Sequence, residues 1–306
     1  MPKRRIVPGE PGVYEHCPCG SGKRSKFCCR TSKGWYCKPH IFDNGAQPTG
    51  VSNPGCVAAS LADCHGSLTR EHVIPLQILD ATFPGSEVSI LGLPFQSGGA
   101  KPIGKGTATS RVTCKRHNNI ASPLDDALGR VYKASLASLD PSNASTSQMV
   151  LVSGPDVERA LLRLVLISVA AKWTSEGGKP VQSDVLPTNL ASAIWGDEEF
   201  NGGLYAITPR YPHSKKLTAM ALAWTAPWRY RGHLVGMGVW IAGIPLAICF
   251  RNIPLFGRHG APYIRAQRRP TRLIIDTGAA QHSITLSWPP EWNTSNAEIT
   301  PQGGMG

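Results

Sequence analysis

The sequence predicts an α+β protein with a zinc knuckle at its N-terminus, a mixed central domain and a strand-rich C-terminal domain. Four cysteines crowd into residues 17–29, which is typical of a small metal-bound module. Apolar residues recur at three- and four-residue steps over 118–133 and again over 155–173, which predicts two helices. After residue 200, short apolar runs are separated by Gly and Pro, which predicts strands.

The expected domains are residues 1–34, 35–140 and 148–306. A cluster of Pro, Ser, Asn and Thr at 140–147 marks the second boundary, because exposed linkers have this composition. At 306 residues the chain is long enough for both larger domains to bury a core. The predicted strands of the last domain are the runs 204–207, 219–224, 234–241, 246–250, 271–275 and 282–288.

The charge distribution favours a polyanionic partner. The formal net charge is +12, and between residues 200 and 275 there are eleven Lys or Arg but no Asp or Glu. We therefore expect this region to bind nucleic acid, with DNA as the expected form, through residues such as Arg265, Arg268 and Arg269. The sequence itself does not separate DNA from RNA, and it contains no base-reading motif.

The cysteines and the apolar runs indicate where the protein works. Nine cysteines without a secretory signal favour a reducing compartment, and the basic residues 1–5 are followed by no apolar segment. The longest uncharged run, 234–250, is interrupted by Gly and Pro and predicts two buried strands, not a membrane helix. We expect a cytoplasmic bacterial or phage-related protein with no membrane partner.

The N-terminal cysteines have the spacing of a zinc site. Cys17-Pro-Cys19 and Cys28-Cys29 flank a Gly-Ser-Gly turn, which lets the two pairs fold back around one ion. The alternative, a disulfide knot, is disfavoured by the absence of a secretory signal. This segment resembles the SEC-C motif, a short zinc module also found on the tail of the bacterial preprotein-translocase motor. Its basic residues suit contact with nucleic acid or with a protein partner.

Residues 35–53 are rich in Gly, Pro and polar side chains and predict a linker into the central domain. Cys37 and His40 within it form a possible spare pair of metal ligands. We favour an ordinary role as linker residues for this pair, because four better-placed ligands follow: Cys56, Cys64, Cys114 and His117. These four are expected to bind a second structural zinc, which stabilises a domain with a small core.

Two separated stretches contain the residues of a hydrolytic centre. The first is Glu71-His72-Val-Ile-Pro, and the second begins at Cys114 and ends at Asn118. A carboxylate that binds a metal ion, a His that deprotonates water and an Asn that orients the His are suited to phosphodiester hydrolysis. Taken alone, a Glu-His pair more often belongs to a core or zinc site, and an Asn after a metal ligand is more often a helix cap.

Together these stretches resemble the HNH endonucleases, and the resemblance covers residues 56–126. It implies a ββα fold, with His72 as general base, Asn118 as the residue that orients it, and Glu71 with Asp125 as ligands of a catalytic Mg²⁺ or Mn²⁺. Asp126 is the alternative to Asp125. The sequence departs from the family pattern in two ways: seven residues separate Cys56 from Cys64 where the family has two, and Glu71 replaces the commoner Asp.

The expected function is therefore metal-dependent hydrolysis of nucleic acid by an HNH-type endonuclease. The first alternative is a zinc-dependent nucleic-acid-binding protein on an inactive HNH scaffold. The second is an adaptor whose N-terminal zinc module recruits a protein. The long insert at 77–113 is expected to be strand and loop, and it either faces the substrate or is passive.

Overall fold

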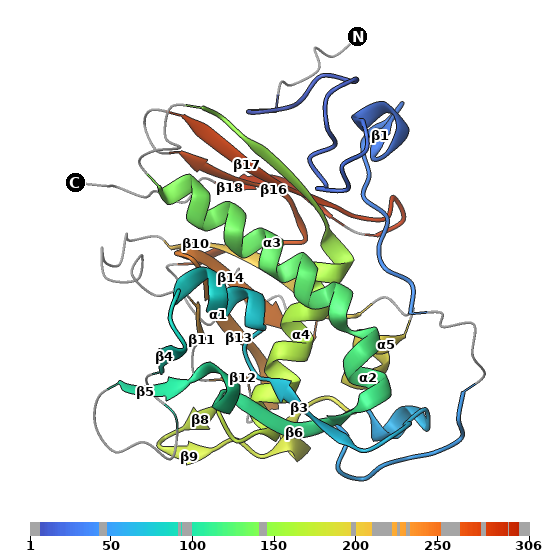
Figure 1. The fold of residues 1–306 in the computed structure, drawn as a ribbon, viewed down its shortest axis with the longest axis vertical. Helices are drawn as coiled ribbons and strands as arrows, with labels where there is room; N and C mark the ends of the chain where they lie inside the picture. Colours follow the sequence, from blue (N-terminus) through green and yellow to red (C-terminus); the bar gives the residue numbers. More distant parts are fainter. Residues whose placement is uncertain are drawn as a thin grey trace.

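The computed structural model describes residues 7–42, 48–90, 93, 100–140, 146–196, 200–209, 222–224, 227–230, 233–251, 264–276, 280–292 and 294–299. It confirms the predicted α+β class, because helices are mixed with strands that form several separate sheets (Figure 1). Most of the expected boundary at 140–147 lies outside the described residues.

The elements have the following bounds. The α-helices are α1 (Leu76–Thr82), α2 (Lys115–Ile120), α3 (Ser122–Leu139), α4 (Gly154–Ala170) and α5 (Leu190–Trp195). The 3-10 helices are η1 (Ser25–Phe27), η2 (Ala59–Leu61), η3 (Lys105–Thr107) and η5 (Ser183–Val185). The strands are β1 (Arg30–Thr31), β2 (Gly34–Trp35), β3 (Leu68–His72), β4 (Glu87–Ile90), β5 (Lys101–Gly104), β6 (Thr109–Cys114), β7 (Met149–Ser153), β8 (Ser175–Glu176), β9 (Lys179–Pro180), β10 (Gly203–Pro209), β11 (Leu222–Trp224), β12 (Trp228–Tyr230), β13 (His233–Ile241), β14 (Ile244–Cys249), β15 (Ile264–Arg268), β16 (Pro270–Asp276), β17 (Gln281–Ser287) and β18 (Ser295–Ile299).

The N-terminal module is docked on the rest of the chain. Gly20 and Gly22 both have a φ of 73°, so the predicted Gly-Ser-Gly reversal is confirmed. Arg130 of α3 donates hydrogen bonds to the carbonyls of Pro18 (3.1 Å) and Leu151 (2.8 Å), and the Leu151 N–H donates to the Pro18 carbonyl (3.1 Å). The module therefore has a fixed position against α3 and β7.

Strands β3 and β6 pair antiparallel, and β6 leads directly into α2 and then α3. The predicted helix over 118–133 is instead two helices. Pro123 lies in the first turn of α3, where its missing N–H is tolerated, whereas it would interrupt a continuous helix. The insert at 77–113 contains the β4–β5 hairpin as expected, together with η3 and most of the unpredicted helix α1.

Helix α4 confirms the helix predicted over 155–173 and is buried over almost its whole length. All its residues from 154 to 169 are buried. Four of them are charged: Asp156, Glu158, Arg159 and Arg163. Because a buried charge without a partner is costly, each of these side chains must bind another segment of the chain.

Two of these charges hold the segment that follows the N-terminal module. The Asp156 carboxylate accepts hydrogen bonds from the His40 N–H at 3.0 and 3.1 Å. Arg159 donates to the carbonyls of His40 (3.1 Å) and Gly196 (2.8 Å). The predicted linker is thus attached to α4 at residue 40.

The C-terminal part contains two larger sheets. One has the order β11-β13-β14-β10-β15, with β12 paired to β13, and the other has the order β18-β16-β17-β7. Strands β10, β13, β14, β16 and β17 confirm five of the predicted runs, and β11 lies in the described part of the sixth. Strands β7, β12, β15 and β18 were not predicted. Helices α3 and α4 pack together and contact strands of both sheets, so this helix pair connects them (Figure 1).

One hydrophobic cluster extends through the protein from Phe42 to Trp288. It includes Leu128 of α3, Leu161 of α4 and Val239 of β13, so segments on both sides of the expected boundary contribute to it. Among the described helices, none combines the length and apolar character that crossing a membrane requires.

Candidate active site and zinc centres

The four N-terminal cysteines form a site that can hold a zinc ion. The ligand atoms of Cys17, Cys19, Cys28 and Cys29 lie within 4.8 Å of one another. The Sγ atoms of Cys19 and Cys28 are 3.5 Å apart, and those of Cys28 and Cys29 are 3.7 Å apart. Sulfurs bound tetrahedrally to one zinc would be about 3.8 Å apart. Burial acts to raise the pKa of the Cys19 thiol, but hydrogen bonds, chiefly from Ser21, outweigh it and bring the pKa down to about 7. The thiolate form, which binds metal, is thereby favoured.

Cys37 lies beside this cluster, whereas His40 does not. The thiols of Cys37 and Cys29 form a hydrogen bond, which lowers the pKa of Cys37. The main chain of Cys37 exchanges two hydrogen bonds with the Ser287 hydroxyl, at 3.0 and 2.9 Å. The His40 ring instead packs edge-on against Phe42, with 5.1 Å between ring centroids. The two candidate spare ligands therefore lie in different environments.

A second group of possible zinc ligands joins the start of α2 to the loop before β3. Cys56, Cys64, Cys114 and His117 are all buried, and their ligand atoms lie within 4.8 Å of one another. The His117 Nδ1 atom is 3.7 Å from the sulfur of Cys56, 3.9 Å from that of Cys64 and 3.2 Å from that of Cys114. Tetrahedral coordination of one zinc predicts about 3.6 Å for these separations. Nδ1 is therefore the ring atom suited to bind the ion.

Residues outside the ligand set support this second group. Trp195 of α5 packs edge-on against the His117 ring at 5.5 Å and donates its indole N–H to the His117 carbonyl at 3.1 Å. Arg116 pairs with Asp63 at 2.8 Å beside the same ligands. Such contacts hold ligands in position before the metal binds. Trp195 belongs to the C-terminal part, so it attaches that part to this candidate zinc site.

Glu71 and Asp125 meet at one buried cation, Arg163 of α4. The Nη2 atom of Arg163 contacts the Glu71 carboxylate, and its Nη1 atom donates to Asp125 at 2.6 Å. The Arg163 and Glu71 side chains are 3% and 5% exposed, whereas Asp125 is 25% exposed. Glu71 and Asp125 therefore converge on a single position for positive charge, with Asp125 on the solvent side.

The pKa values at this centre reflect two buried carboxyl groups that share one guanidinium cation. Burial raises the pKa of Glu71 to about 7, although the Arg163 guanidinium acts in the opposite direction and Asp125 adds to the increase. Burial also raises the pKa of Asp125, again against the effect of Arg163. Asp126, the alternative to Asp125, is exposed and accepts a hydrogen bond from Gln77 instead.

His72 ends β3, where its charge interacts with that of Asp125. Burial lowers its pKa, while the charges of Asp125 and Asp80 and a hydrogen bond with the Lys105 main chain act the other way. Lys105 begins η3 in the insert, and its ammonium group pairs with Asp80 at 2.7 Å. The insert at 77–113 therefore supplies the group that holds the His72 ring.

Asn118 was expected to orient His72, but its side chain forms hydrogen bonds with other residues. Its Nδ2 donates to the Thr69 hydroxyl at 3.1 Å, and its Oδ1 accepts from Arg163 Nη2 at 3.5 Å. No hydrogen bond joins it to His72 within the part of the chain that the structure describes. The register of β3 against β6 shifts between Thr69 and Glu71, and such a bulge redirects side chains next to a site.

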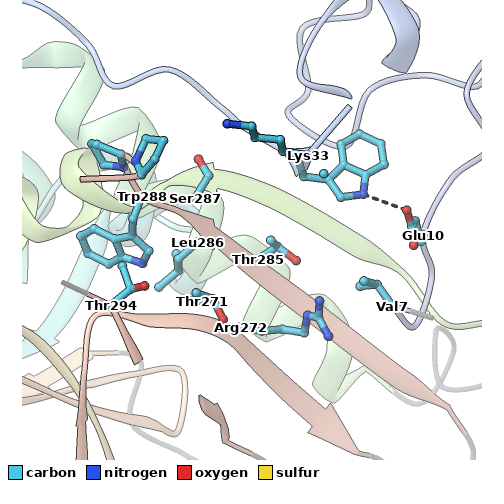
Figure 2. A pocket seen from close by; sticks show the side chains of 14 residues that line it. Val7, Glu10, Lys33, Thr271, Arg272, Thr285, Leu286, Ser287, Trp288 and Thr294 are labelled. Atoms are coloured by element: carbon cyan, nitrogen blue, oxygen red, sulfur yellow. Dashed lines mark hydrogen bonds between the residues drawn. The ribbon is translucent and has the colours of Figure 1, made fainter. Parts of the chain in front are cut away.

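A groove with basic residues lies between the N-terminal module and the four-stranded sheet. It has a volume of about 360 Å³ and is lined on one side by the segment around Lys33 and on the other by Arg272 of β16 and Thr285 of β17. Figure 2 shows Glu10 at its edge, bonded to the indole of Trp35 at 2.9 Å. Glu10 also pairs with Arg30, which neutralises the one acidic group of the lining.

The three arginines expected to contact nucleic acid have different environments. Arg269 is fully buried and pairs with Glu158, so its expected role at the surface is corrected. Arg268 is partly buried and donates to the Gly202 carbonyl at 3.0 Å. The side chain of Arg265 lies outside the described residues.

Arg163, the residue that joins the candidate catalytic groups, was not among the residues predicted from the sequence. The sequence nevertheless contains a signal for it, because α4 has four charged residues among mostly apolar positions. A helix that is buried all round must pair such charges, and the carboxylates of Glu71 and Asp125 were available. The support of His72 by the Lys105 main chain had no signal, because any residue supplies a carbonyl.

Comparison of the chain with protein-family models, with curated proteins and with solved structures finds no match.

Proposed function

We propose that the protein is a metal-dependent endonuclease with an HNH-like centre. The observation that carries this proposal is the meeting of Glu71 and Asp125 at one cation position, with His72 in electrostatic contact with Asp125 and a buried four-ligand cluster at the start of α2. Glu71 and His72 end β3 and Asp125 lies in α3; the antiparallel pair of β3 and β6 precedes α2 and α3, which is the order expected of a ββα unit. The N-terminal cysteines fit an SEC-C-like zinc module by the same spacing argument.

In the proposed reaction, His72 accepts a proton from water while the water oxygen attacks the phosphorus of the substrate. Burial lowers the pKa of His72, so its ring is neutral and able to accept the proton at pH 7. The Lys105 main chain fixes one ring nitrogen, and the Asp125 carboxylate stabilises the imidazolium that forms. The bond from phosphorus to the leaving oxygen then breaks.

Glu71 and Asp125 are the residues that would hold Mg²⁺ or Mn²⁺, because oxygen ligands suit these ions. When bound, such an ion stabilises the charge on the phosphoryl group and on the leaving oxygen. The two carboxylates suit a cation between them, and in the structure the Arg163 guanidinium is that cation.

Nucleic acid, with DNA as the expected form, is the proposed substrate. Its phosphates fit the net charge of +12 and the basic lining of the groove beside Lys33. The docked N-terminal module places this groove against the sheet of the C-terminal part, so the module supports binding of the substrate or of a protein partner.

One observation favours a second candidate, an inactive nucleic-acid-binding protein. Arg163 satisfies both carboxylates, so the centre is stable without a divalent ion. In that case α4 has converted a catalytic site into a structural one, and the zinc clusters and basic groove retain the binding function.

The test is cleavage of plasmid, linear and single-stranded substrates over a series of Mg²⁺ and Mn²⁺ concentrations. His72→Ala should reduce cleavage by about a hundredfold or more, which is the usual contribution of a positioned base. Zinc content and nucleic-acid binding should remain, and His65→Ala, which changes an exposed histidine of the same unit, should cleave normally. Equal activity of His72→Ala and wild type would place the centre elsewhere. Binding without cleavage under any condition would favour the second candidate.

A further inference from the structure

Arg163 projects from the largely apolar helix α4 and is held at the candidate centre by three polar groups. It is 3% exposed, contacts Glu71 through Nη2 and Asp125 through Nη1 at 2.6 Å, and reaches Asn118 Oδ1 at 3.5 Å. A guanidinium presents its N–H groups in a planar fork, so it can bridge two carboxylates that a smaller cation would bind directly.

One polar atom of this side chain is unsatisfied. The Nε atom of Arg163 is buried and has no hydrogen-bond partner among the described residues. Leaving a buried donor unpaired is unfavourable, so the observed position of Arg163 does not satisfy the whole side chain. Its two carboxylate contacts compensate for this, and they are the contacts that a divalent ion would remove.

We propose that Arg163 is the resident cation of this centre and competes with a divalent metal ion for Glu71 and Asp125. A divalent ion and a guanidinium repel each other and draw on the same two carboxylates, each of which Arg163 contacts through one oxygen, so metal binding weakens or displaces these contacts. Binding of a divalent ion to Glu71 and Asp125 is thereby coupled to the position of the Arg163 side chain on α4. The inference uses the carboxylate pair of the proposed function, but it concerns cation binding and does not require cleavage.

The competition is tested by measuring Mn²⁺ binding to zinc-loaded full-length protein by calorimetry. Arg163→Met removes the charge while keeping a long apolar stem, and it should bind Mn²⁺ at least about tenfold more tightly than wild type. Arg159→Met is the matched control. It removes an equally buried arginine one turn earlier on α4, whose described hydrogen bonds go to the carbonyls of His40 and Gly196, and it should leave Mn²⁺ affinity unchanged.

Arg163→Met also leaves Glu71 buried without its cation, so its thermal stability provides a second readout. Mn²⁺ should raise the melting temperature of this variant by more than it raises that of wild type, because the ion then replaces the missing charge. Should Arg163→Met be too unstable to purify, Arg163→Lys keeps a charge but loses the fork, and it should show a smaller gain of the same sign.

Unchanged or weaker Mn²⁺ binding by Arg163→Met or Arg163→Lys, with no preferential gain in melting temperature, would overturn the competition. That result leaves the nuclease proposal intact if wild type still cleaves and His72→Ala does not. Conversely, tighter Mn²⁺ binding by Arg163→Met in a protein that never cleaves would support the competition and remove the nuclease. The two proposals therefore fail separately.

Discussion

Arg269 and Glu158 form an ion pair in the protein interior, where the guanidinium Nε donates to Oε2 at 3.1 Å and Nη2 donates to Oε1 at 3.0 Å. Their side chains are 0% and 2% exposed. Arg269 also donates to the Phe200 carbonyl at 2.9 Å and lies over the ring of Trp292 at 4.4 Å. Its backbone has a φ of 47°, so the turn between β15 and β16 places this side chain inside. The pair therefore joins α4 to both larger sheets.

Removing one partner of this pair should destabilise the fold. Arg269→Met leaves the Glu158 carboxylate buried without its cation, and we expect a loss of about 3–5 kcal/mol in the free energy of unfolding in urea. Arg229→Met is the control, because Arg229 pairs with Glu176 at 2.7 Å on the surface, and exposed ion pairs contribute little to stability. Equal effects of the two substitutions would contradict the structural role of Arg269.

The buried position of Arg269 illustrates which features of the fold can be predicted from the sequence and which cannot. Local patterns predicted the two clusters that could hold zinc, helix α4 and the strand runs, because cysteine spacing and apolar periodicity are properties of short segments. The burial of Arg269 depends on Glu158, which lies 111 residues earlier in the chain, and a count of basic residues does not distinguish paired from free charges. Arg163 was missed for the same reason. Long-range pairing of charges is the information that a single sequence does not contain.

Zinc should be bound at two independent sites. Elemental analysis of the purified protein should find about two zinc ions per chain, and Cys64→Ala should lose one of them and destabilise the fold, because four ligands close a structural site. Cys249→Ala makes the same change at a buried cysteine of β14 outside both clusters, and it should keep both ions. Protein without zinc, in which all thiols react in the native state, would remove both sites.

His282 should make the protein less stable in mild acid. It is 5% exposed, its Nε2 atom is buried without a partner among the described residues, and burial lowers its pKa. Below pH about 6.5 the unfolded chain therefore takes up a proton that the folded chain refuses, so stability falls as the pH decreases.

His282→Leu should reduce this loss of stability. We expect the melting temperature of the variant to fall less between pH 8 and pH 5.5 than that of wild type, with both proteins saturated with zinc. The comparison at pH 8, where the imidazole is neutral in both states, separates the packing effect of the substitution from protonation. A fall of the same size in both proteins would assign the acid sensitivity to other groups.

The groove beside Lys33 should contribute affinity for nucleic acid and no chemistry. Lys33 is exposed at its edge, opposite Arg272 and Thr285, so it can contact a phosphate without leaving a buried charge behind. Lys33→Glu should weaken binding of labelled DNA and reduce the slope of log affinity against log salt by about 1 to 2, because fewer counterions are released on binding. Lys179→Glu reverses an equally exposed lysine on β9, outside the groove lining, and should change neither quantity. If both variants bind and respond to salt alike, the protein's positive charge acts only as a diffuse field, and the groove between the N-terminal module and the sheet has no specific part in binding.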